Sequence, residues 1–155
     1  MNDKYIQPFI DAGQSVISQV TGLNTTLGEI YTKEVPYNSD SVVVLIGLTG
    51  QIYGSVIISL TKSLGCKIAS IMMMGMPVNE LDEIAKSAIS ELCNMMLGNT
   101  AANLYKNNIT VDITPPTVFT GSNMQVTPSK AITTCIPFIL DDGEIINIDV
   151  SYKEK

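Results

Sequence analysis

Apolar residues recur at helical spacing in two segments of the first half of the chain. Residues 3–21 have apolar positions three and four places apart and are followed by Gly22, which predicts a helix that ends there. A second helix is predicted after Thr61, whose hydroxyl can cap it, and should run to about Met74 with Gly75 as its stop.

A third, longer helix is predicted over residues 80–106, with Asn79 as its N-cap and Asp82 at the third helical position. One side of this helix is apolar, and we expect that side to face the core. Its residues are Ile84, Ala85, Ala88, Ile89, Leu92, Met95 and Met96.

Strand patterns rich in β-branched and aliphatic residues occupy the rest of the chain. They cover residues 25–34, 41–48, 52–60, 109–114, 117–120, about 131–140 and 144–152. Thr49-Gly50 and Asp141-Asp142-Gly143 are predicted turns, and residues 121–130 are predicted to be a polar loop.

The order of these elements predicts an α+β fold with two pseudo-repeats, each a helix plus three strands. The last predicted strand of the first half is residues 52–60, and that of the second half is residues 144–152. Long helices should pack on an extended, mostly antiparallel sheet. The 155 residues contain no long linker, so residues 1–155 are expected to form a single domain.

Composition excludes several classes of protein. The chain is 45% hydrophobic and 15% charged, which is typical of a globular protein. Its formal net charge is −6, and its nine basic residues are scattered lysines, so we expect no nucleic-acid partner. With no histidine and no arginine, the chain lacks the usual nucleophile–histidine pair, and the three cysteines suggest no metal site.

The predicted location is the cytoplasm. No apolar stretch is long enough to cross a bilayer, and the start of the chain does not read as a signal peptide. The odd number of cysteines, Cys66, Cys93 and Cys135, fits reduced packing residues.

The third helix also has a polar face with unusual residues. Ser87, Glu91, Asn94 and Gly98 follow one another at intervals of four, three and four residues, so they share a side of the helix. An exposed Glu and Asn are most often solvated surface. Glycine inside a helix lowers its stability by up to about 1 kcal/mol relative to alanine. Gly98 therefore indicates a local requirement, such as close packing or close approach at that point.

The sequence around this face resembles the CheC, CheX and FliY family of chemotaxis phosphatases. Ser87-x3-Glu91-x2-Asn94, continued by Met95-Met96-x-Gly98-Asn99, matches the family's [Asp/Ser]-x3-Glu-x2-Asn signature. The resemblance covers nearly the whole chain, including the doubled layout.

A single site per chain is what the resemblance implies here. The matching stretch of the first helix is Asp11-x3-Ser15-x2-Ser18, in which serines replace both the Glu and the Asn. One motif, in the second half, is the arrangement of the CheX-like members, and the resemblance implies that the protein is a homodimer.

The resemblance also implies a reaction, removal of the phosphoryl group from the aspartyl phosphate of a CheY-type response regulator. Asn94 would then orient the attacking water, and Glu91 would pair with a lysine of the regulator. Ser87 and Gly98 would line the partner interface. No cofactor of its own is implied, and Mg²⁺ is expected to be supplied by the regulator.

Two other interpretations remain open at this stage. In one, the chain is a non-catalytic dimeric adaptor or scaffold of the same fold that binds signalling partners, as CheC binds CheD. In the other, it is an unrelated α+β domain, which would lack the internal repeat.

Overall fold

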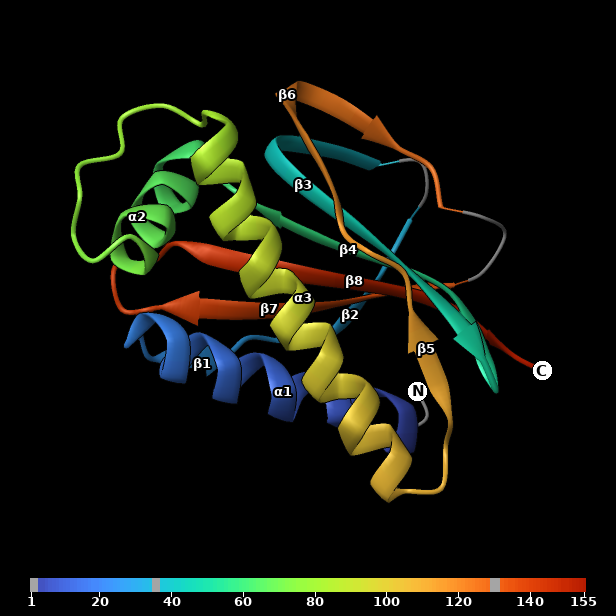
Figure 1. Ribbon diagram of the computed structural model, residues 1–155. Coiled ribbons are helices and arrows are strands. Elements are labelled where there is room, and N and C mark those ends of the chain that lie inside the picture. The colour runs from blue at the N-terminus through green and yellow to red at the C-terminus, as the bar shows by residue number, and fades with distance from the viewer. Residues whose placement is uncertain (1–2, 35–36, 129–131) are drawn as a thin grey trace.

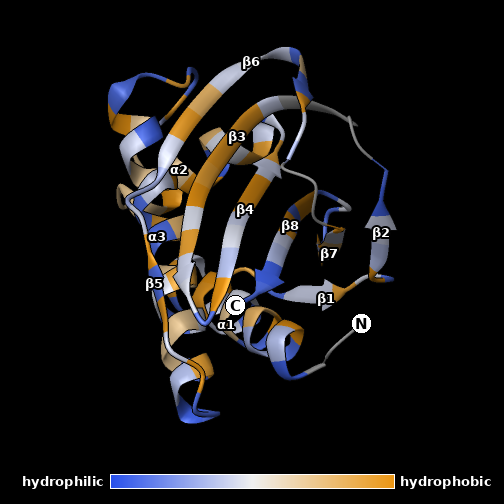
Figure 2. Ribbon diagram, turned by 90° about the vertical axis from the view of Figure 1, so that its right-hand side faces the viewer, coloured by the Kyte–Doolittle hydropathy of each residue, from blue (hydrophilic) through white to orange (hydrophobic). Residues whose placement is uncertain are grey.

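The computed structural model describes residues 3–34, 37–128 and 132–155. In this part of the chain, three helices lie against one face of a single eight-stranded sheet (Figure 1). The other face carries no helix, and the sheet curls around it (Figure 2). The α+β prediction is therefore confirmed.

The three helices begin and end close to their predicted bounds. They are α1 (Asp3–Thr21), α2 (Lys62–Met72) and α3 (Glu83–Lys106). The predicted N-cap of α3 is wrong, because Asp82 and not Asn79 caps the helix. The Asp82 carboxylate accepts a hydrogen bond from the Ala85 N–H at 2.8 Å and so satisfies a free donor of the first turn.

Every pair of neighbouring strands in the described residues is antiparallel. The strands are β1 (Thr25–Leu27), β2 (Tyr31–Lys33), β3 (Tyr37–Gly50), β4 (Ile52–Leu60), β5 (Val111–Ile113), β6 (Thr117–Val126), β7 (Thr133–Leu140) and β8 (Ile145–Glu154). Their order in the sheet is β1-β7-β8-β4-β3-β5, with β2 beside β7 and β6 beside β3.

The internal repeat is present, with four strands in each half where each pseudo-repeat was predicted to have three. In the first half the segment 25–34 divides into two strands, and in the second half all four strand segments of the sequence form strands. The first half is α1 with β1 to β4, and the second is α3 with β5 to β8. β4 and β8 pair at the centre of the sheet. The short strand after each long helix pairs with a strand of the other half. β1 pairs with β7, and β5 pairs with β3. The two halves therefore complete each other's sheet edges.

Two predicted strand segments were wrong in extent. Residues 25–34 divide into β1 and β2, and their register on β7 slips by one residue between Leu27↔Phe138 and Tyr31↔Cys135. Pro137 of β7 lies at this slip, and it has no N–H to offer to a continuous ladder. Residues 121–126, predicted as loop, continue β6 along β3.

The main core lies between the helices and the sheet. Alternate residues of the four long central strands face it, as do the apolar sides of α1, α2 and α3. The largest fully buried side chains include Phe9, Ile17, Ile46, Ile89 and Phe138. None of the described helices is long and apolar enough to cross a membrane.

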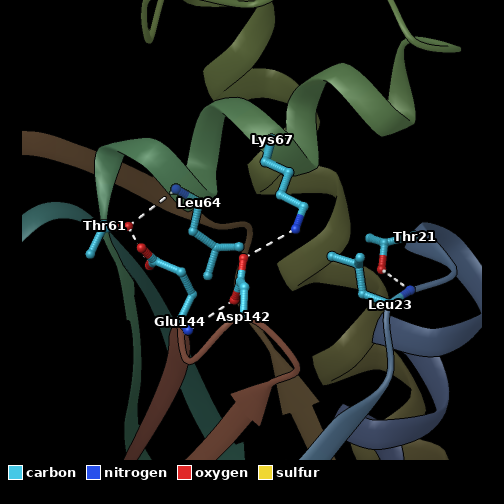
Figure 3. A network of polar contacts seen from close by, with 7 residues as sticks. All are labelled: Thr21, Leu23, Thr61, Leu64, Lys67, Asp142 and Glu144. Carbon is cyan, nitrogen blue, oxygen red and sulfur yellow. Dashed lines mark hydrogen bonds and ion pairs between the residues drawn. The ribbon is translucent and has the colours of Figure 1, made fainter.

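Polar contacts fix α2 to the turn between β7 and β8 (Figure 3). The Thr61 hydroxyl accepts from the Leu64 N–H at 3.1 Å and donates to the Glu144 carboxylate at 2.7 Å. The Lys67 ammonium lies 3.2 Å from the Asp142 carboxylate. This arrangement confirms Thr61 as the predicted N-cap of α2.

The three cysteines are free. Cys93 and Cys135 are buried, and this burial raises the pKa of each thiol to about 12. These two are packing residues, as predicted, whereas Cys66 is only partly buried.

Candidate functional site

The polar face of α3 lies on the surface of the molecule. Ser87, Glu91 and Gly98 are exposed, and Asn94 is half-buried. Behind them, Ile89, Leu92 and Met96 are buried in the core and hold the helix against the sheet. The motif side chains are therefore displayed from a rigid element, as a site for a protein partner requires.

A groove runs beside this face of α3. It has a volume of about 550 Å³, and residues of α3 form one wall while the segment that leaves β5 forms the other. The α3 wall is Ser87, Ser90, Glu91 and Asn94; the facing wall is Ile113, Thr114, Pro115 and Pro116. The groove thus contains Ser87, Glu91 and Asn94 together, whereas Gly98 lies outside it along the helix.

The facing wall is tied to the sheet at one residue. The Thr114 hydroxyl accepts a hydrogen bond from the Gly47 N–H at 2.7 Å, and the Thr114 N–H donates to the Gly47 carbonyl at 3.0 Å. A Cβ at position 47 would lie 3.0 Å from the Thr114 methyl group, so glycine allows this close contact. The rings of Pro115 and Pro116 fix their φ angles, so the backbone of this wall opposite Asn94 is stiff.

The groove contains one ionisable group. Glu91 is its single charged side chain among the described residues that line it. Within the described part of the chain, neither the Glu91 carboxylate nor the Asn94 carboxamide forms a hydrogen bond or ion pair. A carboxylate that accepts and a carboxamide that both donates and accepts are therefore available to an incoming molecule.

The corresponding face of α1 is different. Asp11, Ser15 and Ser18 are all exposed there, and the Asp11 carboxylate accepts a hydrogen bond from the Gln7 side chain at 2.9 Å. At the end of β1, Gly28 donates its N–H to the Pro137 carbonyl at 2.8 Å, as Thr114 does to Gly47 in the other half. Gly28 has no hydroxyl with which to make a second bond, so the first half lacks both the motif and the anchor.

Sequence reasoning found part of this site and missed the rest. It placed Ser87, Glu91 and Asn94 together, and the structure does so too. It missed the wall of Thr114, Pro115 and Pro116, because the two prolines were left between the predicted strands 109–114 and 117–120 and no role was assigned to them.

Two residues of α3 that were predicted to face the core are exposed to solvent instead. Ile84 is 62% exposed and Met95 is 40% exposed. They flank the motif on the outer face of the helix, while Ile89 and Leu92 face the core.

Comparison with known proteins identifies relatives of the whole chain. Residues 42–139 match the family described as chemotaxis phosphatase CheX. The Thermotoga maritima protein named CheY-P phosphatase CheX is 35% identical over 156 residues, which cover 99% of this chain and 98% of that protein.

Solved structures share the fold over nearly the full length. A CheC-like superfamily protein from Shewanella sp. PV-4 is 25% identical with a TM-score of 0.89, over 99% of both chains. A chain of the Borrelia burgdorferi CheX-CheY-BeF3-Mg²⁺ complex is 28% identical with a TM-score of 0.84, over 97% of this chain and 98% of that one.

Proposed function

The chain belongs to the CheX family of chemotaxis phosphatases, and from this premise we propose that it dephosphorylates the aspartyl phosphate of a CheY-type response regulator. One observation carries the proposal. The unpaired Glu91 and Asn94 side chains lie together in an open groove, in a chain 35% identical to a CheY-P phosphatase. A known structural relative was captured in a complex with CheY.

In the proposed reaction, Asn94 acts on water. Its carboxamide holds a water molecule in line with the bond between phosphorus and the aspartate oxygen. The water oxygen bonds to phosphorus, that P–O bond breaks, and inorganic phosphate and a free aspartate result. Phosphoryl transfer of this kind depends on positioning and charge stabilisation more than on a protein nucleophile. A chain without histidine can therefore perform it.

Glu91 is proposed to hold the regulator. Its carboxylate is exposed one turn before Asn94, where it can pair with a lysine beside the phosphoaspartate. Ser87 lies a further turn back in the same groove and is proposed to contact the partner. Mg²⁺ is proposed to come with the regulator, because the ion binds through few carboxylates together with the phosphoryl oxygens, and the regulator carries the phosphoryl group.

An Asn94→Ala variant tests this function. We expect it to lose the stimulated release of phosphate, by about 100-fold or more, because no group then positions the water. Phosphate release from a phosphorylated CheY receiver domain, with and without the protein, is the measurement. Ser18→Ala, at the matching place on α1, should keep the full rate.

The outcome separates this function from the adaptor role. An unchanged rate for Asn94→Ala would show that the catalytic assignment is wrong. A wild-type protein that binds the receiver domain without releasing phosphate would favour a non-catalytic adaptor.

We also propose that the protein is a homodimer formed through β6. This strand pairs with β3 on one side and with no other described strand. Beside it, on the helix-free face, an apolar groove of about 770 Å³ includes Leu45, Ile57 and Phe119. An open strand edge next to apolar surface can extend its sheet into a second copy.

We place the protein in the cytoplasm. A response regulator as substrate and three free cysteines both fit a reducing compartment.

A further inference from the structure

The helix-free face of the sheet has a buried polar row on β7 and β8. Apolar residues of these strands, such as Ile136 and Ile148, face the helices, and the residues that alternate with them point to the opposite face. Four of these alternate residues carry a hydroxyl, a thiol or a carboxylate and are at most 1% exposed, although no described helix covers this face. The row consists of Thr133, Cys135, Asp149 and Ser151.

The short strand β2 covers this polar row. Tyr31 is the direct cross-strand neighbour of Cys135, and Lys33 is that of Thr133, so the side chains of β2 share a face with the row. The Lys33 ammonium lies 2.8 Å from the Asp149 carboxylate, which belongs to β8, on the far side of β7. The Lys33 side chain is 16% exposed and that of Asp149 is fully buried. One residue of β2 thus closes over a carboxylate two strands away.

This closed arrangement leaves one buried oxygen without a donor. Lys33 contacts Oδ2 of Asp149, and within the described part of the chain no group donates a hydrogen bond to Oδ1. The neighbouring Cys135 thiol donates instead to the Asn147 side chain at 3.5 Å. A buried carboxylate oxygen without a donor disfavours the closed form relative to a form in which water reaches that oxygen.

Few other contacts hold β2 in place. The strand is three residues long, pairs with β7 and with no other described strand, and does not continue the ladder of β1 in register. Tyr31 and Thr32 are exposed, so Lys33 is the least exposed residue of the strand. Segments with few buried contacts open at a lower free energy than the whole fold needs to unfold.

We propose that β2 is a strap that opens and closes over the polar row, with the ion pair of Lys33 and Asp149 as its clasp. Opening lets water reach the Asp149 carboxylate and brings the Cys135 thiol to solvent. In the closed form burial raises the pKa of this thiol to about 12, which keeps it unreactive at neutral pH. The strap therefore controls when Cys135 can react. This inference does not depend on the phosphatase function proposed above.

Labelling of the wild-type protein with N-ethylmaleimide, followed by peptide mass spectrometry, tests the strap. Cys66 is partly exposed, Cys135 lies under β2, and Cys93 is buried in the main core. We expect Cys66 to react first, and Cys135 to react well before Cys93. Strap opening exposes little surface, so the Cys135 rate should hardly change with urea below the unfolding transition. The Cys93 rate should rise steeply with urea, because Cys93 needs global unfolding.

Variants test the clasp itself. Lys33→Met leaves the Asp149 carboxylate buried without its cation, so labelling of Cys135 should become about tenfold faster or more. Lys62→Met is the matched control, because it breaks a lysine–carboxylate pair of the same length whose side chains are 50% and 77% exposed. Such a surface pair contributes little, so the Cys135 rate should stay at the wild-type value.

Three results would overturn the proposal. Equal rates and equal urea dependence for Cys135 and Cys93 would mean that β2 opens only when the whole protein unfolds. A Cys135 rate equal to that of Cys66 would mean that the polar row is not closed. An unchanged Cys135 rate in Lys33→Met would show that Lys33 is not the clasp. The first two comparisons use the wild-type protein, so they hold even where Lys33→Met does not fold.

Discussion

Two glycines on the long helices have opposite roles. A Cβ at Gly13 of α1 would lie 2.5 Å from the Phe138 ring, so close packing of helix on sheet requires glycine there. A Cβ at Gly98 of α3 would meet nothing within 4 Å. The fold of this chain therefore does not require Gly98, although glycine lowers the stability of a helix.

Alanine substitutions should separate these roles. We expect Gly98→Ala to raise the free energy of unfolding by about 0.5–1 kcal/mol, as helix propensity predicts. Gly13→Ala should lower it by about 1–3 kcal/mol, because the new methyl group overpacks the core. Urea unfolding measures both changes.

The same Gly98→Ala variant tests the role of this residue at the partner interface. Its affinity for the activated receiver domain should fall even though the protein is more stable. Wild-type affinity would mean that Gly98 does not mark a point of close approach.

At the scale of elements, the site depends on two segments from different parts of the chain. α3 displays Glu91 and Asn94, and the segment after β5 faces them through Pro115 and Pro116. The distance between these walls is set by the hydrogen bonds of Thr114 to Gly47, which belongs to the other half of the chain. The groove of the second half is thus built on a strand of the first.

A Thr114→Val variant should loosen this wall. It keeps the shape of the side chain but leaves the Gly47 N–H without its acceptor, which costs about 1 kcal/mol of stability. We expect kcat/KM for phosphate release to fall several-fold, because the wall is no longer fixed against β3.

Thr114→Ser is the control for this change, since it retains the hydroxyl and should keep kcat/KM near the wild-type value. Equal activity of the Val and Ser variants would show that the hydrogen bond does not position the groove.

At the scale of the whole molecule, the two halves of the chain differ in the side chains that they expose. The two halves share an order of helix and strands and complete one sheet, yet the motif, its facing anchor and the large apolar residues exposed on a long helix all belong to the second half. The apolar groove on the helix-free face shares no lining residue with the groove beside α3. We therefore expect a dimer that covers the helix-free face to leave Glu91 and Asn94 available to the regulator.

The dimer proposal predicts the effect of a charge beside β6. Phe119 is 46% exposed in the isolated chain, and Phe119→Lys should convert the protein to a monomer, because a buried unpaired ammonium is costly. Light scattering after size-exclusion chromatography gives the mass. Thr26→Lys, on the exposed strand β1 at the other sheet edge, should remain dimeric. A monomeric wild-type protein would refute the dimer, and a dimeric Phe119→Lys would refute this interface.

Local signals in the sequence determined the elements and the motif. Helical spacing, the Thr61 cap and the β-branched runs depend on neighbours a few residues apart, so they could be read directly. The same holds for Glu91 and Asn94, whose spacing alone puts them on one face of a helix. Local spacing misplaced the start of α3, because Asn79 was predicted as its N-cap and Asp82, three residues later, caps the helix.

Only the tertiary structure decided what surrounds the motif. α3 is apolar on two sides, and periodicity cannot tell which of them the sheet will cover, so Ile84 and Met95 were assigned to the core. The bond between Thr114 and Gly47 joins residues 67 positions apart, and no local pattern predicts such a contact. The sequence determined which side chains form the motif, and long-range packing determined the groove in which they lie.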